Sequence, residues 1–172
     1  MKINSKLPKV GTNIFTIMSQ LAQENNAVNL SQGAPDFDCS ADLIELVHQY
    51  MKKGRNQYAP MMGVYELREQ ISLKSENLYH SSYDVDSEIT VTAGGSEAIF
   101  SALGAVINAG DEVILFDPSY DLYRPTIELF GGIPKTVQLM APDFKIDWGK
   151  VRELITDKTR LILINNPNNP AG

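Results

Sequence analysis

The stretch "DEVILFDPSY", residues 111–120, decides the fold class because four consecutive apolar residues lead directly into a polar turn. A short apolar run bounded by turn residues is typical of a strand that is covered on both faces. Further strands are predicted at "EITVTAGG" (88–95), "IPKTVQL" (133–139) and "TRLILIN" (159–165). Helices are predicted between them, and this alternation indicates an α/β domain with a largely parallel sheet flanked by helices.

Helices are also predicted before the first of these strands. Apolar residues recur at helical spacing over residues 13–23, 43–50 and 64–79. We expect residues 1–45 to form an N-terminal arm and part of a small domain, and residues 46–172 to form an incomplete large domain.

The helices between the strands are predicted at 96–110, at 121–131 with an interruption near Pro125, and at 147–155. Asp147 is a plausible N-cap of the third of these helices, because its carboxylate can accept hydrogen bonds from the first turn.

Composition and charge restrict the class of function. The net charge of −6 argues against a nucleic-acid or anionic-membrane partner. Cys39 is the single cysteine, so no intrachain disulfide can form and a cytoplasmic location is expected. The two histidines, His48 and His80, are well separated, which leaves no basis for a metal site. The N-terminus lacks the apolar core of a signal peptide, and no apolar stretch is long enough to span a bilayer.

Polar and glycine residues follow three of the predicted strands, at 94–96, 117–120 and 165–169. Ligands of open α/β sheets bind beyond the carboxyl ends of the strands, so we expect one crevice to collect all three segments. Gly95 and Ser96 open a helix, where backbone N–H groups and the helix dipole bind phosphate. The alternative is a tight strand-to-helix connection in which Ser96 is an ordinary N-cap.

The other candidate residues also have a binding and a structural interpretation. Tyr120 could stack on a planar ligand or simply cover the rim of the sheet. The prolines of "NNPNNP" (165–170) restrict the backbone around Asn169, which suits either a fixed amide or an ordinary turn. Gly33 could let a ligand carboxylate approach the backbone or merely permit a bend, and Tyr58 is a loop hydroxyl.

Five motifs, taken together in their order along the chain, indicate a family resemblance. They are "NLSQGAPDFD" (29–38), "NQYAPMMGVYELRE" (56–69), "ITVTAGGSEAI" (89–99), "GDEVILFDPSYDLY" (110–123) and "NPNNPAG" (166–172). Together they resemble the N-terminal half of the class I and II, fold-type I aminotransferases that depend on pyridoxal 5'-phosphate. The likeness is strongest to bacterial methionine aminotransferases and kynurenine–oxoglutarate transaminases. It implies the fold-type I transferase fold with a truncated large domain and an N-terminal arm.

The resemblance implies a coenzyme-binding role for five residues. Gly95 and Ser96 match the backbone donors that hold the phosphate of pyridoxal 5'-phosphate, and Tyr120 matches the residue stacked on its ring. Asn169 corresponds to the asparagine that binds the ring hydroxyl. Tyr58 resembles the tyrosine that reaches across a homodimer to the phosphate of the neighbouring subunit.

Substrate contacts are implied for two further residues. Gly33 is similar to the glycine whose backbone meets the substrate carboxylate, and Phe15 is similar to a residue that lines the substrate entrance. The sequence departs from the family at Ala34, where relatives often carry an aromatic residue, and at Ala171, where a small hydroxyl residue is usual.

The resemblance also implies that the chain ends in the middle of a domain, before the lysine that binds the coenzyme covalently. The chain's own lysines are expected on polar helix faces or in loops, whereas a catalytic lysine needs a desolvated setting that lowers its pKa. This expectation concerns seven of the chain's lysines, namely Lys52, Lys53, Lys74, Lys135, Lys145, Lys150 and Lys158.

The implied reaction moves an amino group from an L-amino acid of methionine or aromatic type to a 2-oxo acid. The isolated chain is expected to be inactive. Two alternatives remain open: a C–S β-lyase of the same fold, and a noncatalytic truncated chain. The expected partners are the amino acid and 2-oxo acid substrates and a second copy of the full-length subunit, with no nucleic acid and no membrane.

Overall fold

The protein is described by a computed structural model that covers residues 4–8, 10–33 and 35–172. Ala34, one of the two departures from the family pattern, lies outside these described residues. In the part of the chain that is described, no helix is long and apolar enough to cross a membrane.

The chain divides into two compact units. One unit combines Met1–Asn13 with Ala93–Gly172, and the other is Ile14–Thr92. We call them the sheet unit and the helical unit. The division expected from the sequence, at 1–45 and 46–172, stays a prediction.

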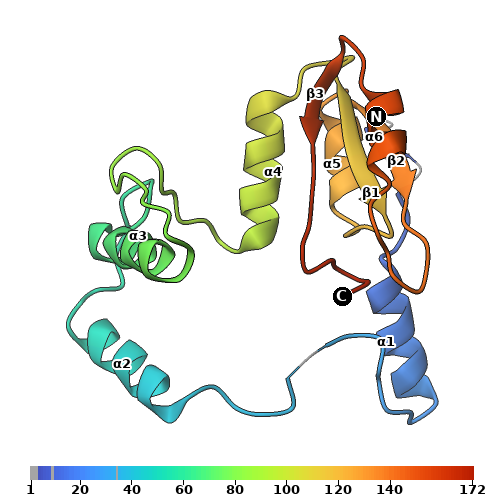
Figure 1. Cartoon of the computed structure of the whole chain (residues 1–172). Coiled ribbons are helices and arrows are strands. Elements are labelled where there is room, and N and C mark those ends of the chain that lie inside the picture. The colour runs from blue at the N-terminus through green and yellow to red at the C-terminus, as the bar shows by residue number, and fades with distance from the viewer. Residues whose placement is uncertain (1–3, 9, 34) are drawn as a thin grey trace. The chain divides into compact units, whose positions relative to one another are not determined.

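The sheet unit is built on three parallel strands in the order β2-β1-β3 (Figure 1). The strands are β1 (Glu112–Asp117), β2 (Ile133–Gln138) and β3 (Thr159–Ile162). The apolar run of the opening motif is the central strand, and its four apolar residues are buried. A strand that is paired on both edges and covered on both faces requires such a run, so the predicted parallel α/β arrangement is confirmed.

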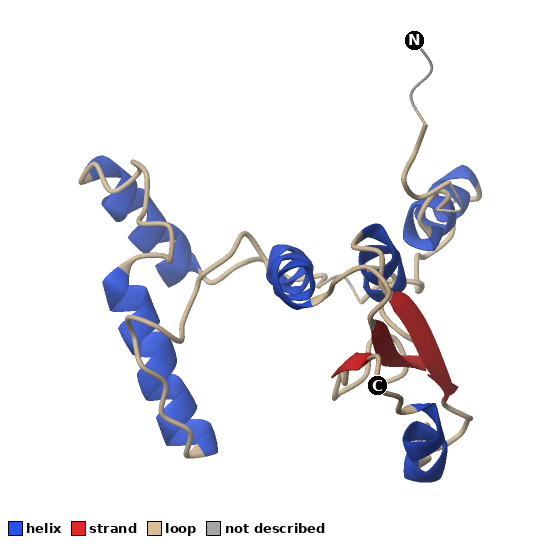
Figure 2. Cartoon of the chain, turned by 90° about the horizontal axis from the view of Figure 1, so that it is seen from above, coloured by secondary structure: helices blue, strands red, loops and turns tan. Residues whose placement is uncertain are grey.

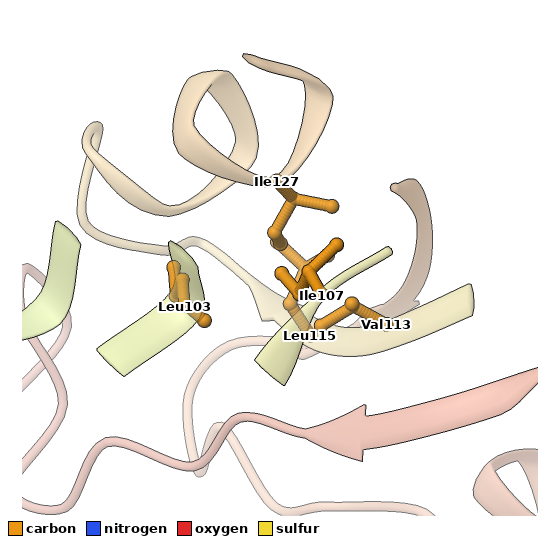
Figure 3. Packing of buried hydrophobic residues seen from close by; sticks show 5 residues of the cluster. All are labelled: Leu103, Ile107, Val113, Leu115 and Ile127. Atoms are coloured by element: carbon orange, nitrogen blue, oxygen red, sulfur yellow. The ribbon is translucent and has the colours of Figure 1, made fainter. Parts of the chain in front are cut away.

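Helices cover both faces of the sheet (Figure 2). On one face, α4 (Gly95–Val106) and α5 (Tyr123–Leu129) contribute to a cluster of buried aliphatic residues (Figure 3). On the other face, α6 (Trp148–Leu154) packs through Val151 against Ile114, Phe116 and β2. The alternation of side chains along β1 therefore sends successive residues into two separate cores. The first cluster consists of Leu103, Ile107, Val113, Leu115 and Ile127.

The helical unit contains α1 (Ile14–Glu24), α2 (Ala41–Lys52) and α3 (Tyr65–Tyr79), as the apolar spacing predicts. No residue of α1 or α2 is buried. Leu46 and Val47 of α2, which belong to the predicted apolar stripe, are each about half exposed. The apolar faces of α1 and α2 are therefore not buried by the part of the chain that the structure describes.

The predicted strand at 88–92 is wrong. These residues have no regular secondary structure, and Val91 N–H donates to the carbonyl of Met62 at 3.0 Å. A strand requires a neighbouring strand that takes up a ladder of hydrogen bonds. No such ladder reaches this segment from the described residues.

Three smaller expectations are also corrected. The N-cap of α4 is Gly94 rather than Ser96, which lies inside the first turn. Pro125 does not interrupt a helix, because α5 begins at Tyr123 and places the proline in its first turn, where no intrahelical N–H bond is lost. Lys135 lies on β2 rather than on a helix or loop.

The predicted N-cap of α6 is confirmed. Asp147 Oδ1 accepts hydrogen bonds from the backbone N–H groups of Gly149 at 2.9 Å and Lys150 at 3.2 Å.

Candidate functional site

The start of α4 is open to a ligand. Gly94 has a φ of +93°, which favours glycine, and no atom lies within 4 Å of a Cβ built at Gly94 or Gly95. Gly95 and Ser96 are exposed residues of the first turn of this twelve-residue helix. Backbone N–H groups and the positive end of the dipole therefore face space that an anion can enter. Glu97 Oε2 turns back and accepts the N–H of Ala93 at 2.5 Å, which fixes the turn.

The segment after β1 lies beside this turn. The hydroxyls of Ser96 and Tyr120 are 3.4 Å apart, although 24 positions separate them in the sequence. Within the segment, Ser119 Oγ donates to Asp117 Oδ1 at 2.7 Å. Asp117 also pairs with Arg124 of α5 at 3.3 Å, so the turn is anchored to both β1 and α5.

The segment after β3 contacts the turn that follows β1. Asn168 Nδ2 donates to the carbonyl of Pro118 at 3.4 Å, and Asn168 Oδ1 accepts the N–H of Ala171 at 3.0 Å. Asn165 Oδ1 accepts the N–H of Asn169 at 2.7 Å. The Asn165 and Asn168 side chains thus hold the turn, whereas Asn169 is exposed. Both Asn-Pro peptide bonds of this turn are cis.

These contacts bring together the three segments for which the sequence predicts a common crevice. Ser96 meets Tyr120, and Asn168 meets Pro118 in the same turn. A hollow of about 300 Å3 lies next to them and is lined by three asparagines of the last turn and by Phe116 and Tyr123. Burial raises the pKa of the Tyr123 phenol above its ordinary value, and the nearby Tyr120 adds to this effect. The asparagines are Asn165, Asn166 and Asn168.

The remaining predicted site residues belong to the helical unit. The Tyr58 side chain is fully exposed and borders a hollow of about 660 Å3 that Tyr50, Arg55 and Tyr65 also line. The carbonyl of Phe15 accepts a hydrogen bond from Gln32 Nε2 at 3.3 Å. This contact places Phe15 next to the segment that contains Gly33, so the two predicted substrate residues lie near one another. Gly33 is exposed, and a Cβ there would meet no atom within 4 Å.

Sequence reasoning missed the clamp that holds the Tyr58 loop. Arg68 of α3 is 7% exposed, and its guanidinium donates to the carbonyl of Gly63 at 3.2 Å and to that of Val85. Gly63 has a φ of +96°, and a Cβ there would lie 2.7 Å from Val91. The Val85 carbonyl lies 17 positions from Arg68, so this half of the clamp gives no local sequence signal.

Three lysines of the sheet unit have anionic partners. Lys135 pairs with Glu112 at 3.2 Å, Lys145 with Asp143 at 2.8 Å and Lys150 with Asp147 at 3.8 Å. A catalytic lysine needs a desolvated setting, whereas the side chains of Lys145 and Lys150 are 82% and 63% exposed. In the described ranges, no group of three or more potential metal ligands is found.

Comparisons with known proteins identify the family of the chain. The sequence profile of the family described as "Aminotransferase class I and II" matches residues 25–172. The chain belongs to this family. Class I and II aminotransferases depend on pyridoxal 5'-phosphate, and this assignment confirms the family resemblance and the coenzyme predicted from the sequence.

Three relatives show how similar and how extensive the match is. Methionine aminotransferase of Escherichia coli K12 is 53% identical over 168 residues, which are 98% of this chain and 44% of that protein. A crystal structure of YbdL from Escherichia coli, reported with a methionine aminotransferase function, has a TM-score of 0.96 and 51% identity over 99% of this chain and 45% of that chain. Kynurenine–oxoglutarate transaminase of Dictyostelium discoideum is 33% identical over 99% of this chain and 43% of that protein. The chain therefore spans less than half the length of these relatives.

The residues present fit the coenzyme. Its phosphate requires N–H donors in open space, and the first turn of α4 offers those of Gly95 and Ser96 next to two glycines that have no atom within 4 Å of an added Cβ. Its ring requires a flat aromatic partner near the phosphate, and the Tyr120 hydroxyl is 3.4 Å from Ser96 Oγ.

Proposed function

We propose that this chain forms the phosphate-binding and ring-binding part of an aminotransferase subunit. The substrates are an L-amino acid of methionine or aromatic type and a 2-oxo acid. The observation that carries the proposal is the contact of Ser96 with Tyr120, together with that of Asn168 with Pro118. These contacts support the proposal because they join the start of α4, the Tyr120 ring and the asparagine turn.

Each residue has a distinct task in this proposal. The N–H groups of Gly95 and Ser96 and the Ser96 hydroxyl hold the phosphate, and the ring of Tyr120 lies against the face of the coenzyme ring. The Asn169 amide donates to the ring hydroxyl and fixes the angle of the ring in its plane. Gly33 and Phe15 meet the substrate.

The chemistry of transamination comes from the coenzyme, whose ring accepts the electron pair released when the Cα–H bond of the amino acid breaks. The protein's part is orientation, which lowers the barrier by aligning the reacting groups. A base must take the Cα proton, and the paired lysines of the sheet unit are poor candidates for this task. We therefore expect no transaminase activity from the chain alone.

A second copy of the subunit belongs to the proposal. Tyr58 is fully exposed, and the end of its loop is fixed at Gly63, whose carbonyl accepts a hydrogen bond from Arg68. An exposed hydroxyl on a fixed loop suits a contact across a subunit interface, so we assign Tyr58 to the phosphate site of the partner in a homodimer. A cytoplasmic location also remains part of the proposal, supported by a free and exposed Cys39.

A chimera tests the function. This chain replaces the matching segment of Escherichia coli methionine aminotransferase, to which it is 53% identical, and the host supplies the rest of the subunit. We expect the chimera to bind pyridoxal 5'-phosphate and to form methionine's oxo acid in the presence of a 2-oxo acid acceptor. A cysteine–sulfur conjugate, assayed in parallel, distinguishes transamination from β-elimination.

Single variants show whether coenzyme binding by the chimera depends on residues of this chain. Ser96→Ala should weaken the binding of pyridoxamine 5'-phosphate, an analogue without the aldehyde that reacts with surface lysines. The matched control is Ser101→Ala, an exposed serine later in the same helix. A folded chimera that binds no coenzyme would overturn the proposed function.

A further inference from the structure

Tyr123 is a buried aromatic residue next to the proposed ring-binding residue. It is the first residue of α5 and is 7% exposed. Its backbone N–H donates to the carbonyl of Tyr120 at 3.1 Å. The two rings meet edge to face, with centroids 5.7 Å apart and an interplanar angle of 75°. No role is assigned to Tyr123 by the coenzyme contacts proposed above.

The edge-to-face contact restricts the Tyr120 ring from one side. Aromatic rings favour this arrangement because the positive edge of one ring meets the negative face of the other. At its other end, the Tyr120 hydroxyl is 3.4 Å from Ser96 Oγ. Tyr120 itself is only partly buried, so its ring orientation depends on side-chain contacts such as these two. Tyr123 is the buried and therefore the more rigid of the two partners.

Tyr123 also reaches the third segment of the site. Together with Asn165, Asn166 and Asn168 it lines the hollow of about 300 Å3 at the end of the sheet. The same side chain therefore borders both the aromatic platform after β1 and the asparagine turn after β3. A substitution at Tyr123 therefore affects both the support of the Tyr120 ring and the packing of the asparagine turn.

We propose that Tyr123 is a positioning residue whose ring holds Tyr120 in the orientation that stacks on the coenzyme ring. This inference rests on the proposed function, because it assumes that Tyr120 contacts the coenzyme. Tyr123 itself touches neither coenzyme nor substrate and acts through Tyr120.

The test measures the affinity of the chimera for pyridoxamine 5'-phosphate by fluorescence titration. Tyr123→Leu removes the ring and should weaken binding by roughly 2- to 12-fold, the range expected from the loss of one aromatic pair. Tyr123→Phe keeps the aromatic ring and should hold the affinity to within about 2-fold of the parent. Tyr123→Met serves as a second variant with a similar volume if the leucine variant does not fold.

Two comparisons separate positioning from general destabilisation. Trp148→Leu removes a similar edge-to-face pair, with Phe116 at 6.4 Å and 70° on the opposite face of the sheet, and should leave the affinity unchanged. Inorganic phosphate, used as a competitor, probes the α4 site alone, and its affinity should be the same with and without the Tyr123 ring.

A double-mutant cycle gives the sharpest result. If Tyr123 acts through Tyr120, then Tyr123→Leu should have no further effect in a chimera that already contains Tyr120→Leu. Additive losses, or an unchanged affinity in the folded single variant, would overturn the inference while leaving the proposed function intact. A parent chimera that binds no pyridoxamine 5'-phosphate would overturn both.

Discussion

Alanine at Gly63 should be one of the most destabilising small substitutions in the helical unit. Gly63 closes a turn in which its N–H donates to the carbonyl of Pro60 at 2.8 Å, and its φ is +96°. A side chain at such a φ costs roughly 1–2 kcal/mol. The added Cβ would also lie 2.7 Å from both Cβ and Cγ2 of Val91, and overpacking of this kind costs roughly 1–3 kcal/mol. The two terms give an expected loss of about 2–5 kcal/mol.

Gly54 provides a matched control in the same unit. Its φ is +74°, but no atom lies within 4 Å of a Cβ built there. Gly54→Ala should therefore carry only the conformational cost of about 1–2 kcal/mol. The difference between the two variants isolates the clash with Val91, because backbone strain is common to both.

Urea unfolding of the chimera, followed by far-ultraviolet circular dichroism, measures both losses. We expect the Gly63→Ala midpoint to lie clearly below that of Gly54→Ala, with both below the parent. Equal midpoints for the two variants would refute the reasoning, since the close approach of Val91 would then have no energetic consequence.

Three further predictions concern stability. Arg68→Met removes the donors of two backbone carbonyls and should lower the free energy of unfolding by about 2–3 kcal/mol in urea titrations, with a smaller loss for Arg68→Lys. Hydrogen bonding from Thr156, followed by the contact with Lys135, holds the pKa of Glu112 below its ordinary value of 4.5. The ionised carboxylate therefore stabilises the fold above about that pH and loses this effect as the pH falls, so Glu112→Gln should show a shallower loss of stability in acid. Asp147→Ala removes the N-cap of α6 and should cost about 0.5–2 kcal/mol, measured by thermal unfolding.

Contrary results for these variants are equally specific. If Arg68→Lys were as unstable as Arg68→Met, the positive charge at position 68 would contribute nothing by itself. The stability would then come from the guanidinium hydrogen bonds alone. If the free energy of unfolding fell equally steeply with falling pH in the parent and in Glu112→Gln, the lowered pKa of Glu112 would be contradicted. An unchanged melting temperature for Asp147→Ala, compared with a substitution of the exposed Asp157, would contradict the capping role.

Features that depend on local pattern were predicted well from the sequence. The apolar period gave α1, α2 and α3 to within about two residues, and the four-residue apolar run gave the buried central strand. The rule that ligands bind at the carboxyl ends of parallel strands grouped 117–120 with 165–169, which follow β1 and β3 and meet through Asn168 and Pro118. The rule does not account for 94–96, which lies beside Tyr120 without following a strand of the described sheet.

Features that depend on distant partners were not predicted. The segment 88–92 has the composition of a strand, but a strand exists only when a neighbouring edge accepts its hydrogen bonds. The clamp formed by Arg68 and the close packing of Gly63 on Val91 join positions far apart in the sequence. The edge-to-face contact of Tyr123 with Tyr120 is local, yet it depends on the start of α5, which Pro125 obscured.

The most direct measurement is a crystal structure of the chimera with pyridoxamine 5'-phosphate. The account predicts the phosphate on the N–H groups of Gly95 and Ser96, the ring against Tyr120, and the Asn169 amide on the ring hydroxyl. A phosphate bound away from the first turn of α4, or a ring that leaves Tyr120 without a contact, would contradict the claim that these three segments form one coenzyme site.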